Sequence, residues 1–335
     1  MESKQITGEA PHFSCTFTQS VPELLFGLKI TVALSTYQAG KVVFLSARDP
    51  NRLIQLPRNF KRAMGIAVGE NRLAIAANDE ILVLTNNKNL APTYPDKPDT
   101  YDGLFLPRAV HYTGYVAMHD MAWTKHGLTG VNTMFSCLCT VDYEYSFKPI
   151  WKPFFINDLI PRDNCHLNGM ADEKGKIKYA TALGKTDTQG SWRENKLEGG
   201  ILMDVEKNEI ILEKLSMPHS PRIYKGNLYM LLSAAGELIK VDTKKGTYET
   251  VLRLGGFVRG LSIYKDYAFI GMSKLRHKTS AFMDLPIADK SELSGVAIVH
   301  LPTKSKAGLI EYQTGVKEIY DLKILPGLKS PNILN

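Results

Sequence analysis

Three of the eight histidines in this chain of 335 residues stand just before, or at the start of, a short apolar run. They are His119, His166 and His219. A neutral imidazole can accept a proton or bind a metal ion, so three rings brought together could support acid–base chemistry or hold iron or zinc. Asp120 follows His119 directly, and one histidine with one carboxylate suffices for general acid–base catalysis. We therefore take His119, Asp120 and His166 as candidate catalytic residues.

Other polar residues stand at similar places and could bind a ligand. Guanidinium groups hold anions through paired hydrogen bonds, and an indole ring can stack on a sugar or a peptide. The candidate ligand-binding residues are Asn132, Asn168, His219, Arg222, Arg259, Trp192, Arg193 and Arg276. The alternative for Arg222 and Arg259 is that they tie neighbouring parts of the fold together through carbonyl groups, and Trp192 could simply anchor a loop.

A repeated phrase shows which elements position these residues. A small residue lies between apolar ones, a turn follows, and a second apolar run begins six residues after the Ala or Ser of the first. The pairs are Gly65 to Ala67 with Leu73 to Ala76, Gly169 to Ala171 with Ile177 to Ala180, and Gly260 to Ser262 with Ala268 to Ile270. Self-similarity at a period of tens of residues indicates a repeat architecture. Since the units have the pattern of β-hairpins, we predict an all-β fold, a single closed β-propeller.

The phrase also predicts the number of blades. It should form the innermost strand of each blade, and these strands begin near Met64, His119, Asn168, Ser220 and Arg259. Their separation of about 40 to 55 residues suits four-stranded blades. The region before Met64 supplies one more blade, completed by the C-terminal run Val316 to Leu322, which removes the open sheet edge. We predict six blades; five or seven blades, and a β-sandwich with coincidental similarity, are the alternatives.

The domain prediction is one propeller over residues 1–335, with residues 1–20 as an N-terminal extension and 328–335 as a C-terminal tail. The one helix we expect is short, Val21 to Leu28. Two long polar insertions, Gly184 to Gly199 and Ser273 to Ser294, fall between second and third strands. Those turns share a face with the starts of the innermost strands, so we expect the site at that mouth of the central channel.

A metal site is the weaker interpretation of the histidines, and we predict none. His119 and His166 stand at different offsets from the repeated phrase, so the alternation of side chains along a strand would turn some rings away from the channel. Histidines held by structural hydrogen bonds are the alternative. The sequence assigns no cofactor.

Charge, cysteines and missing signals narrow the class of protein. The net charge is only +7, and no basic run with interleaved aromatic residues occurs, which disfavours nucleic acid as a partner. The chain lacks a secretory signal at its start and any apolar run of the roughly 20 residues that a membrane helix needs, so we expect a cytoplasmic protein without a membrane span. Cys137 and Cys139 should face the same side of a strand as buried, free thiols.

Searches for common catalytic motifs are negative. The chain has no G-x-x-x-x-G-K-[ST], no G-x-G-x-x-G after a strand, no H-E-x-x-H and no G-x-S-x-G. Nucleotide-dependent phosphoryl transfer, Rossmann redox chemistry, zincin proteolysis and α/β-hydrolase chemistry are therefore disfavoured.

Several longer phrases resemble a bacterial family of conserved hypothetical proteins. They include Ser35 to Lys41, His119 to Trp123, Val131 to Thr133, Phe135 to Leu138, Cys165 to Gly169, Leu215 to Arg222, Phe257 to Leu261 and Gly315 to Gly327. The family is a domain of unknown function, common in cyanobacteria and proteobacteria and in places attached to tetratricopeptide modules. The resemblance implies a propeller-like fold and a cytoplasmic, bacterial setting, and it implies no activity.

The sequence thus predicts a propeller that binds a small polar, sugar or peptide ligand at the channel mouth. Histidine and aspartate acid–base or metal-assisted chemistry could accompany binding, so the sequence leaves open whether the protein is an enzyme. The alternative is a protein–protein interaction platform without catalysis, which the absence of a complete catalytic motif favours.

Overall fold

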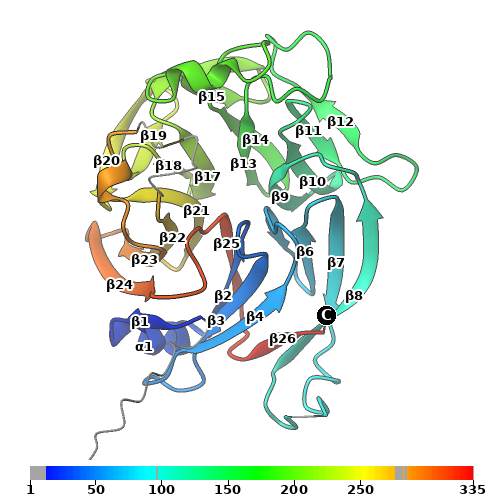
Figure 1. The fold of residues 1–335 in the computed structure, drawn as a ribbon, viewed down its shortest axis with the longest axis vertical. Coiled ribbons are helices and arrows are strands. Elements are labelled where there is room, and N and C mark those ends of the chain that lie inside the picture. Colours follow the sequence, from blue (N-terminus) through cyan, green and yellow to red (C-terminus); the bar gives the residue numbers. More distant parts are fainter. Residues whose placement is uncertain (1–12, 96, 276–281, 283–284, 335) are drawn as a thin grey trace, which may run out of the picture.

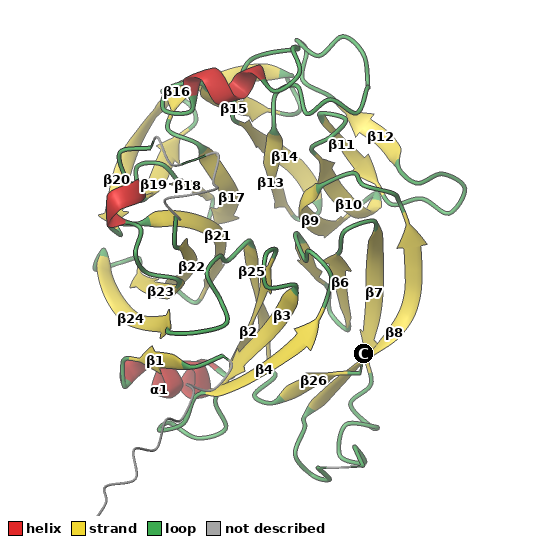
Figure 2. Cartoon of the chain, in the orientation of Figure 1, coloured by secondary structure: helices red, strands yellow, loops and turns green. Residues whose placement is uncertain are grey.

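The described residues fold into six β-sheets arranged around a central axis (Figure 1). The structure is a computed structural model, and it describes residues 13–95, 97–275, 282 and 285–334. Each sheet is a blade whose strands run outward from the axis, and Figure 2 shows that helix is confined to short segments at the periphery. The fold is therefore a six-bladed β-propeller, which confirms the predicted class and the predicted number of blades.

The first blade is closed by the C-terminal end of the chain. Its strands, from the axis outward, are β25 (Asp321–Pro326), β2 (Ile30–Thr36), β3 (Lys41–Ser46) and β4 (Ile54–Asn59). In Figure 1 the red β25 lies beside the blue β2, with Asp321 opposite Ser35 and Pro326 opposite Ile30. This confirms closure by a C-terminal strand, although the strand begins at Asp321, later than the predicted Val316.

The other blades follow in chain order, each again given from the axis outward. Blade 2 has β5 (Ile66–Val68), β6 (Arg72–Ala76), β7 (Glu80–Asn86) and β8 (Gly103–Tyr112); blade 3 has β9 (Met118–Thr124), β10 (Gly127–Asn132), β11 (Cys137–Thr140) and β12 (Lys148–Trp151). Blade 4 has β13 (Leu167–Glu173), β14 (Lys176–Ala182), β15 (Gly200–Asp204) and β16 (Glu209–Leu215); blade 5 has β17 (Pro218–Tyr224), β18 (Asn227–Leu232), β19 (Glu237–Asp242) and β20 (Thr247–Arg253). Blade 6 has β21 (Phe257–Tyr264), β22 (Tyr267–Ser273), β23 (Gly295–His300) and β24 (Ser305–Tyr312).

Both ends of the chain add a strand to an outer sheet edge. The segment expected as an N-terminal extension contains β1 (Cys15–Phe17), which pairs antiparallel with β24. The segment expected as a C-terminal tail contains β26 (Pro331–Ile333), which pairs parallel with the start of β8. The helices are α1 (Ser20–Leu28), close to the expected position, and the 3-10 turns η1 (Ser191–Asn195) and η2 (Ala288–Lys290).

The hydrophobic core lies between the blades rather than at one centre. On β3, Val43 and Leu45 pack toward blade 6, whereas Val42 and Phe44 pack toward blade 2. Each blade is thus buried on both faces, and this is why many strands are continuous apolar runs rather than alternating ones. Cys137 and Cys139 both lie in the cluster between blades 2 and 3, which confirms that they share a face and are buried.

Candidate histidine mouth

Polar and aromatic side chains gather where the innermost strands begin, on the face of the propeller that we call the histidine face. Turns between second and third strands emerge on the same face, so residues far apart in sequence meet there. We define the histidine mouth as His119, His166, His219, Arg259, Tyr320 and Trp192. These side chains come from blades 1, 3, 4, 5 and 6, and they surround the start of the central channel.

Two of the histidines, in blades 3 and 5, are held by the same pattern of hydrogen bonds. His119 Nδ1 lies 2.9 Å from the carbonyl oxygen of Ala117 and 2.8 Å from Thr133 Oγ1. His219 Nδ1 lies 3.1 Å from the carbonyl oxygen of Met217 and 2.9 Å from Ser233 Oγ. Since a carbonyl can only accept, both Nδ1 atoms carry the hydrogen. Each Nε2 then keeps its lone pair, and no described residue donates a hydrogen bond to it.

The third histidine is oriented by a carboxylate from its own loop. His166 Nδ1 lies 2.9 Å from Asp163 Oδ1, and Trp192 Nε1 donates to Asp163 Oδ2 at 3.3 Å. The Trp192 ring, only 3% exposed, lies 4.2 Å from the His166 ring, and the Arg193 guanidinium covers it at 4.1 Å. Trp192 therefore anchors the insertion between β14 and β15 and also packs on a candidate site residue.

Contacts between rings, and between rings and guanidinium groups, connect Trp192, His166, His119, Tyr320 and Arg259 into one continuous row. The His119 ring lies 4.8 Å from that of His166 and 5.3 Å from that of Tyr320, whose other neighbour, Tyr37, is at 5.8 Å. The Arg259 guanidinium lies 3.4 Å from the centre of the Tyr320 ring, a close cation–π contact. The aromatic side chains of this row each carry a polar atom on a rigid ring, so they form a surface with fixed geometry.

The electrostatics of the mouth keep His119 and His219 neutral. Burial lowers the pKa of His119 well below 6.5, and the nearby His166 ring and Arg259 guanidinium add to this effect. Burial and then Arg259 lower the pKa of His219 in the same way. Burial also raises the pKa of Glu318, which outweighs the opposing effect of Arg259. No carboxylate of the described residues forms an ion pair with Arg259, although Glu318 lies close enough for Arg259 to lower its pKa.

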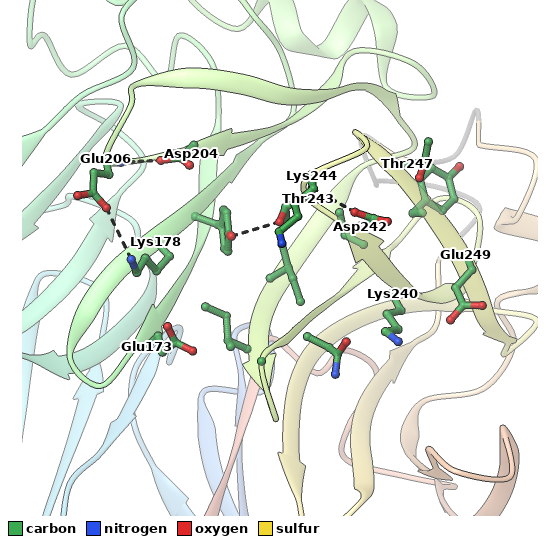
Figure 3. Close-up of a pocket in the computed structure, with 17 residues that line it drawn as sticks. Glu173, Lys178, Asp204, Glu206, Lys240, Asp242, Thr243, Lys244, Thr247 and Glu249 are labelled. Carbon is green, nitrogen blue, oxygen red and sulfur yellow. Dashed lines mark hydrogen bonds and ion pairs between the residues drawn. The ribbon is translucent and has the colours of Figure 1, made fainter.

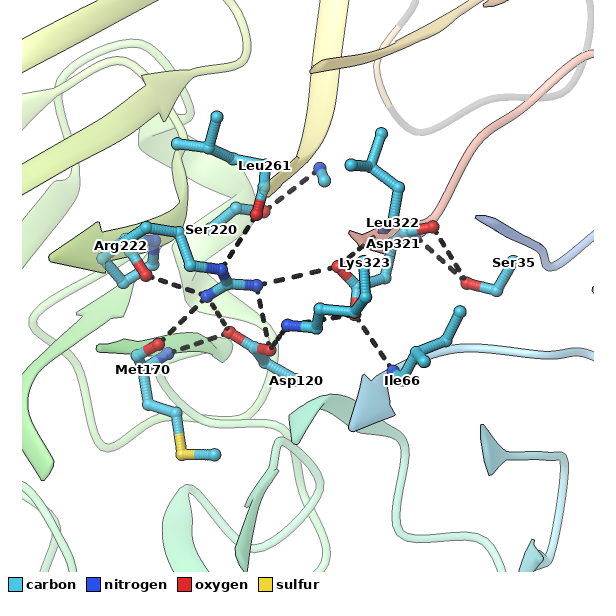
Figure 4. A network of polar contacts seen from close by, with 12 residues as sticks. Ser35, Ile66, Asp120, Met170, Ser220, Arg222, Leu261, Asp321, Leu322 and Lys323 are labelled. Carbon is cyan, nitrogen blue, oxygen red and sulfur yellow. Dashed lines mark hydrogen bonds and ion pairs between the residues drawn. The ribbon is translucent and has the colours of Figure 1, made fainter. Parts of the chain in front are cut away.

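Asp120 and Arg222 lie deeper, in an ion-pair network that crosses the channel (Figure 4). Arg222 donates from Nη1 to Asp120 Oδ2 at 2.7 Å and from Nη2 to Asp120 Oδ1 at 3.1 Å. Lys323 lies 3.0 Å from Asp120 Oδ1 and 3.5 Å from Asp321 Oδ2. Burial opposes the charge on Asp120, but Arg222 and Lys323 outweigh it and hold its pKa below the ordinary value.

The network touches every blade. Met170 N, in blade 4, donates to Asp120 Oδ2 at 3.3 Å, and Ile66 N, in blade 2, donates to Asp321 Oδ2 at 3.0 Å. Arg222 Nε donates to the carbonyl oxygen of Leu261, in blade 6, at 2.9 Å. Arg222 thus ties blades together, the structural alternative weighed for it. His119 and Asp120 are neighbours in sequence, yet the imidazole lies in the mouth and the carboxylate in the network.

The remaining candidate residues are placed as follows. Asn132 is fully buried at the end of β10, where its side-chain oxygen accepts from Phe135 N at 3.1 Å. Asn168 is also buried, and its side-chain oxygen accepts from Thr181 Oγ1 at 2.7 Å. Asn132 thus holds the turn after β10, whereas Asn168 joins β13 to β14. Arg276 lies outside the described residues.

Two of the cavities that lie away from the histidine mouth differ in their lining. One, about 610 Å³, is a groove between blades 4 and 5 lined by carboxylates and ammonium groups such as Glu206 and Lys178, which pair at 3.6 Å (Figure 3). The other, about 640 Å³, opens on the opposite face of the propeller; we call it the distal cavity. Within the described ranges, no group of three or more His, Cys, Asp and Glu is arranged to hold a metal ion. The part of the chain that the structure describes has no helix long and apolar enough to cross a membrane, and the cytoplasmic location stays a prediction.

Sequence reasoning missed several residues of the mouth and the network. Tyr320 stands just before β25, at the place where blades 3, 4, 5 and 6 each have a candidate site residue, and Lys323 follows on that strand. Thr133 and Ser233 each come fourteen residues after their histidine, a spacing that blades 3 and 5 share. That spacing is a signal the sequence carried.

Comparison with known proteins identifies the family. A family model described as a domain of unknown function (DUF4915) matches residues 19–334. No curated protein matches the chain. Among solved structures, a chain described as part of the crystal structure of a nidogen/laminin complex is similar with a TM-score of 0.59 and 10% sequence identity, over 89% of this chain and 99% of that chain. At that identity the likeness concerns the fold alone. This chain therefore belongs to the DUF4915 family, and it has the fold of a six-bladed β-propeller.

Proposed function

We propose that this propeller binds a small polar ligand with an anionic group at the histidine mouth. The observation that carries the proposal is an Arg259 guanidinium close to two neutral histidines, His119 and His219. Among the described residues, no carboxylate forms an ion pair with Arg259, and no residue donates a hydrogen bond to the Nε2 atoms of these histidines. The anionic group would pair with Arg259, and hydroxyl or amide groups of the ligand would donate to the Nε2 atoms. Sugar acids and peptide carboxylates have this chemistry.

The way the rings are held supports binding by a pre-formed site. His119 and His219 each have Nδ1 fixed by two acceptors, and His166 is fixed by Asp163. Fixed rings lose little conformational entropy when a ligand binds, and this favours affinity. Histidines whose pKa is lowered by burial are neutral at pH 7, so they serve as hydrogen-bond acceptors and as weak bases.

Thermal unfolding with a panel of compounds tests this proposal. The panel contains sugar acids, dipeptides, phosphates and uncharged sugars. A ligand at 100 times its Kd stabilises the folded state by about 2.7 kcal/mol, which gives a clear rise in Tm. We expect an anionic compound to raise the Tm of the natural chain, and we expect Arg259→Gln to abolish that rise.

The matched control is Arg253→Gln. Arg253 is an arginine with a 76% exposed side chain on the rim of blade 5, away from the mouth. If the active compounds are uncharged or cationic, or if Arg253→Gln removes the effect as fully as Arg259→Gln, the proposal is wrong.

A second candidate function is a protein-interaction platform, favoured by exposed aromatic side chains on blades 2 and 3. Tyr112, Tyr143 and Tyr145 are 74%, 94% and 65% exposed, and the His111 ring lies 5.4 Å from that of Tyr143. Exposed aromatic groups of this kind are enriched at protein interfaces. A Tyr112→Ser/Tyr143→Ser variant that loses partners captured by the natural chain would favour the platform, and identical capture would exclude this patch.

A further inference from the structure

The distal cavity is built from all six innermost strands on the face opposite the histidine mouth. Its volume is about 640 Å³. Its lining residues include one aliphatic side chain from each blade: Val68, Ala122, Ala171, Ile223, Ile263 and Ile324. A ring of aliphatic groups around a cavity of this size fits the apolar body of a small molecule.

The floor of the distal cavity is cationic. Arg222 and Lys323 line it, with side chains 17% and 14% exposed. Their partners Asp120 and Asp321 do not line it, and those side chains are only 5% and 4% exposed. At the floor, the carboxylates of Asp120 and Asp321 therefore lie behind the cations, and the N–H groups of Arg222 and Lys323 face the cavity.

The cations at the floor have N–H hydrogens that are not used in hydrogen bonds within the described residues. An ammonium group has three hydrogens, and the contacts of Lys323 within the described residues are the two carboxylate oxygens at 3.0 and 3.5 Å. Arg222 Nη2 has two hydrogens, one donated to Asp120 Oδ1 and the other with only a distant acceptor, Asp321 Oδ1 at 3.7 Å. Two donors thus remain for a single acceptor group such as a carboxylate.

The rim limits the charge that a ligand can carry. Glu70 and Asp172 lie at the wall, and Asp172 already accepts from Gly175 N at 3.0 Å. Two acidic groups at the opening disfavour a multiply charged anion, whereas one negative charge can be paired at the floor. The rest of the ligand must be apolar to match the aliphatic ring.

We infer that the distal cavity is a second binding site, for a monocarboxylate with an apolar body. The carboxylate contacts Lys323 and Arg222, and the hydrocarbon lies within the aliphatic ring. The ion-pair network separates this site from the histidine mouth, so the inference does not depend on the proposed function of the mouth.

Isothermal titration with three probes of equal chain length tests the inference: octanoate, octylamine and 1-octanol. We expect octanoate to bind at least about tenfold more tightly than either of the others, because only it pairs with the floor. Equal or tighter binding of octylamine would overturn the inference, as would no measurable binding of octanoate.

Variants locate the bound probe. Ala122→Leu and Ser262→Leu narrow the cavity without altering a residue of the ion-pair network. Each should weaken the binding of octanoate by about tenfold or more. Glu70→Gln removes a negative charge at the rim and should increase the affinity for octanoate. Arg259→Gln, in the histidine mouth, should leave octanoate affinity unchanged. Loss of binding in Arg259→Gln, or unchanged binding in both narrowed variants, would place octanoate elsewhere and overturn the inference.

Discussion

At the residue scale, the histidine mouth depends on backbone conformations that few side chains adopt. Ala117 and Met217 have φ of 50° and 53°, in the left-handed region, and their carbonyls point at the rings of His119 and His219. A non-glycine residue in that region costs about 1 kcal/mol and persists where the surroundings enforce it. The same strained backbone conformation two residues before the histidine, in two different blades, indicates that the fold is built to fix the orientation of these rings.

The neutral histidines predict a pH-dependent stability. Their pKa is lowered in the folded state, so below pH 6.5 the unfolded chain binds protons that the folded chain excludes. Stability should therefore fall as the pH drops through this value, by about 1.4 kcal/mol per pH unit for each histidine. Urea denaturation between pH 7.5 and 5 measures the slope.

The same series on two variants assigns that slope. We expect His219→Gln to have a shallower slope than the natural chain. His126→Gln, an exposed histidine on the turn between β9 and β10, should leave the slope unchanged. An identical slope in all three proteins would show that other groups cause the pH dependence.

Arg222 predicts a different kind of effect. Arg222→Met would leave Asp120 buried with one cation fewer, and breaking a buried pair in this way costs about 3–5 kcal/mol. Lys207→Met, which removes a pair with Glu209 whose side chains are 66% and 55% exposed, should cost far less, because water and salt screen an exposed pair. Chemical denaturation compares the two. Similar small losses would mean that the channel network does not stabilise the ring of blades.

At the scale of elements, the closing segment shows how a strand boundary is decided. The chain leaves β24 at Tyr312 and must cross to the axis before β25 can begin. Val316 and Ile319 are buried along this crossing, in the cluster between blades 6 and 1. Their apolar pattern resembles a strand, but they pack across the sheet ends, so pairing with β2 starts only at Asp321.

Removal of β25 should abolish folding. A chain ending at Gly315 loses the innermost strand of blade 1 and exposes both its edge and the clusters beside it. We expect its soluble expression to collapse. A chain ending at Gly327 keeps β25 and loses only β26, so it should remain soluble with a lower Tm. A chain ending at Gly315 that melts like the full chain would contradict the closure.

At the scale of the whole molecule, the propeller is a ring of interfaces. A buried cluster fills each junction between neighbouring blades, from the one between blades 1 and 2 to the one between blades 6 and 1. Opening one junction removes the support of the next, so we expect the ring to unfold as a unit.

The cysteines report on this cooperativity. Cys137 and Cys139 lie between blades 2 and 3, and Cys165 lies between blades 3 and 4, where burial raises the pKa of its thiol to about 12. In the native protein, Cys15 should react with a thiol reagent first, because only it is partly exposed. The other three should react together, at the rate of global unfolding. Much faster labelling of Cys165 would indicate that the blades open independently.

Denatured protein without reductant should show four reactive thiols.

The sequence by itself determined the propeller, the number of blades and the chain segment that closes the ring. It could do so because the repeated phrase, Gly65 to Ala67 and its later copies, records a local pattern that each blade must satisfy separately. The approximate position of the histidines followed too, since every innermost strand begins on one face.

Only the tertiary structure decided what each of those residues does. Along β9, consecutive side chains point different ways, so His119 lies in the mouth while Asp120 pairs with Arg222, 102 residues away. The pairing of Asp120 with Lys323 joins blades 3 and 1, and the stacking of Arg259 on Tyr320 joins blades 6 and 1. Such contacts arise only when the ring closes, and no local pattern in the sequence encodes them.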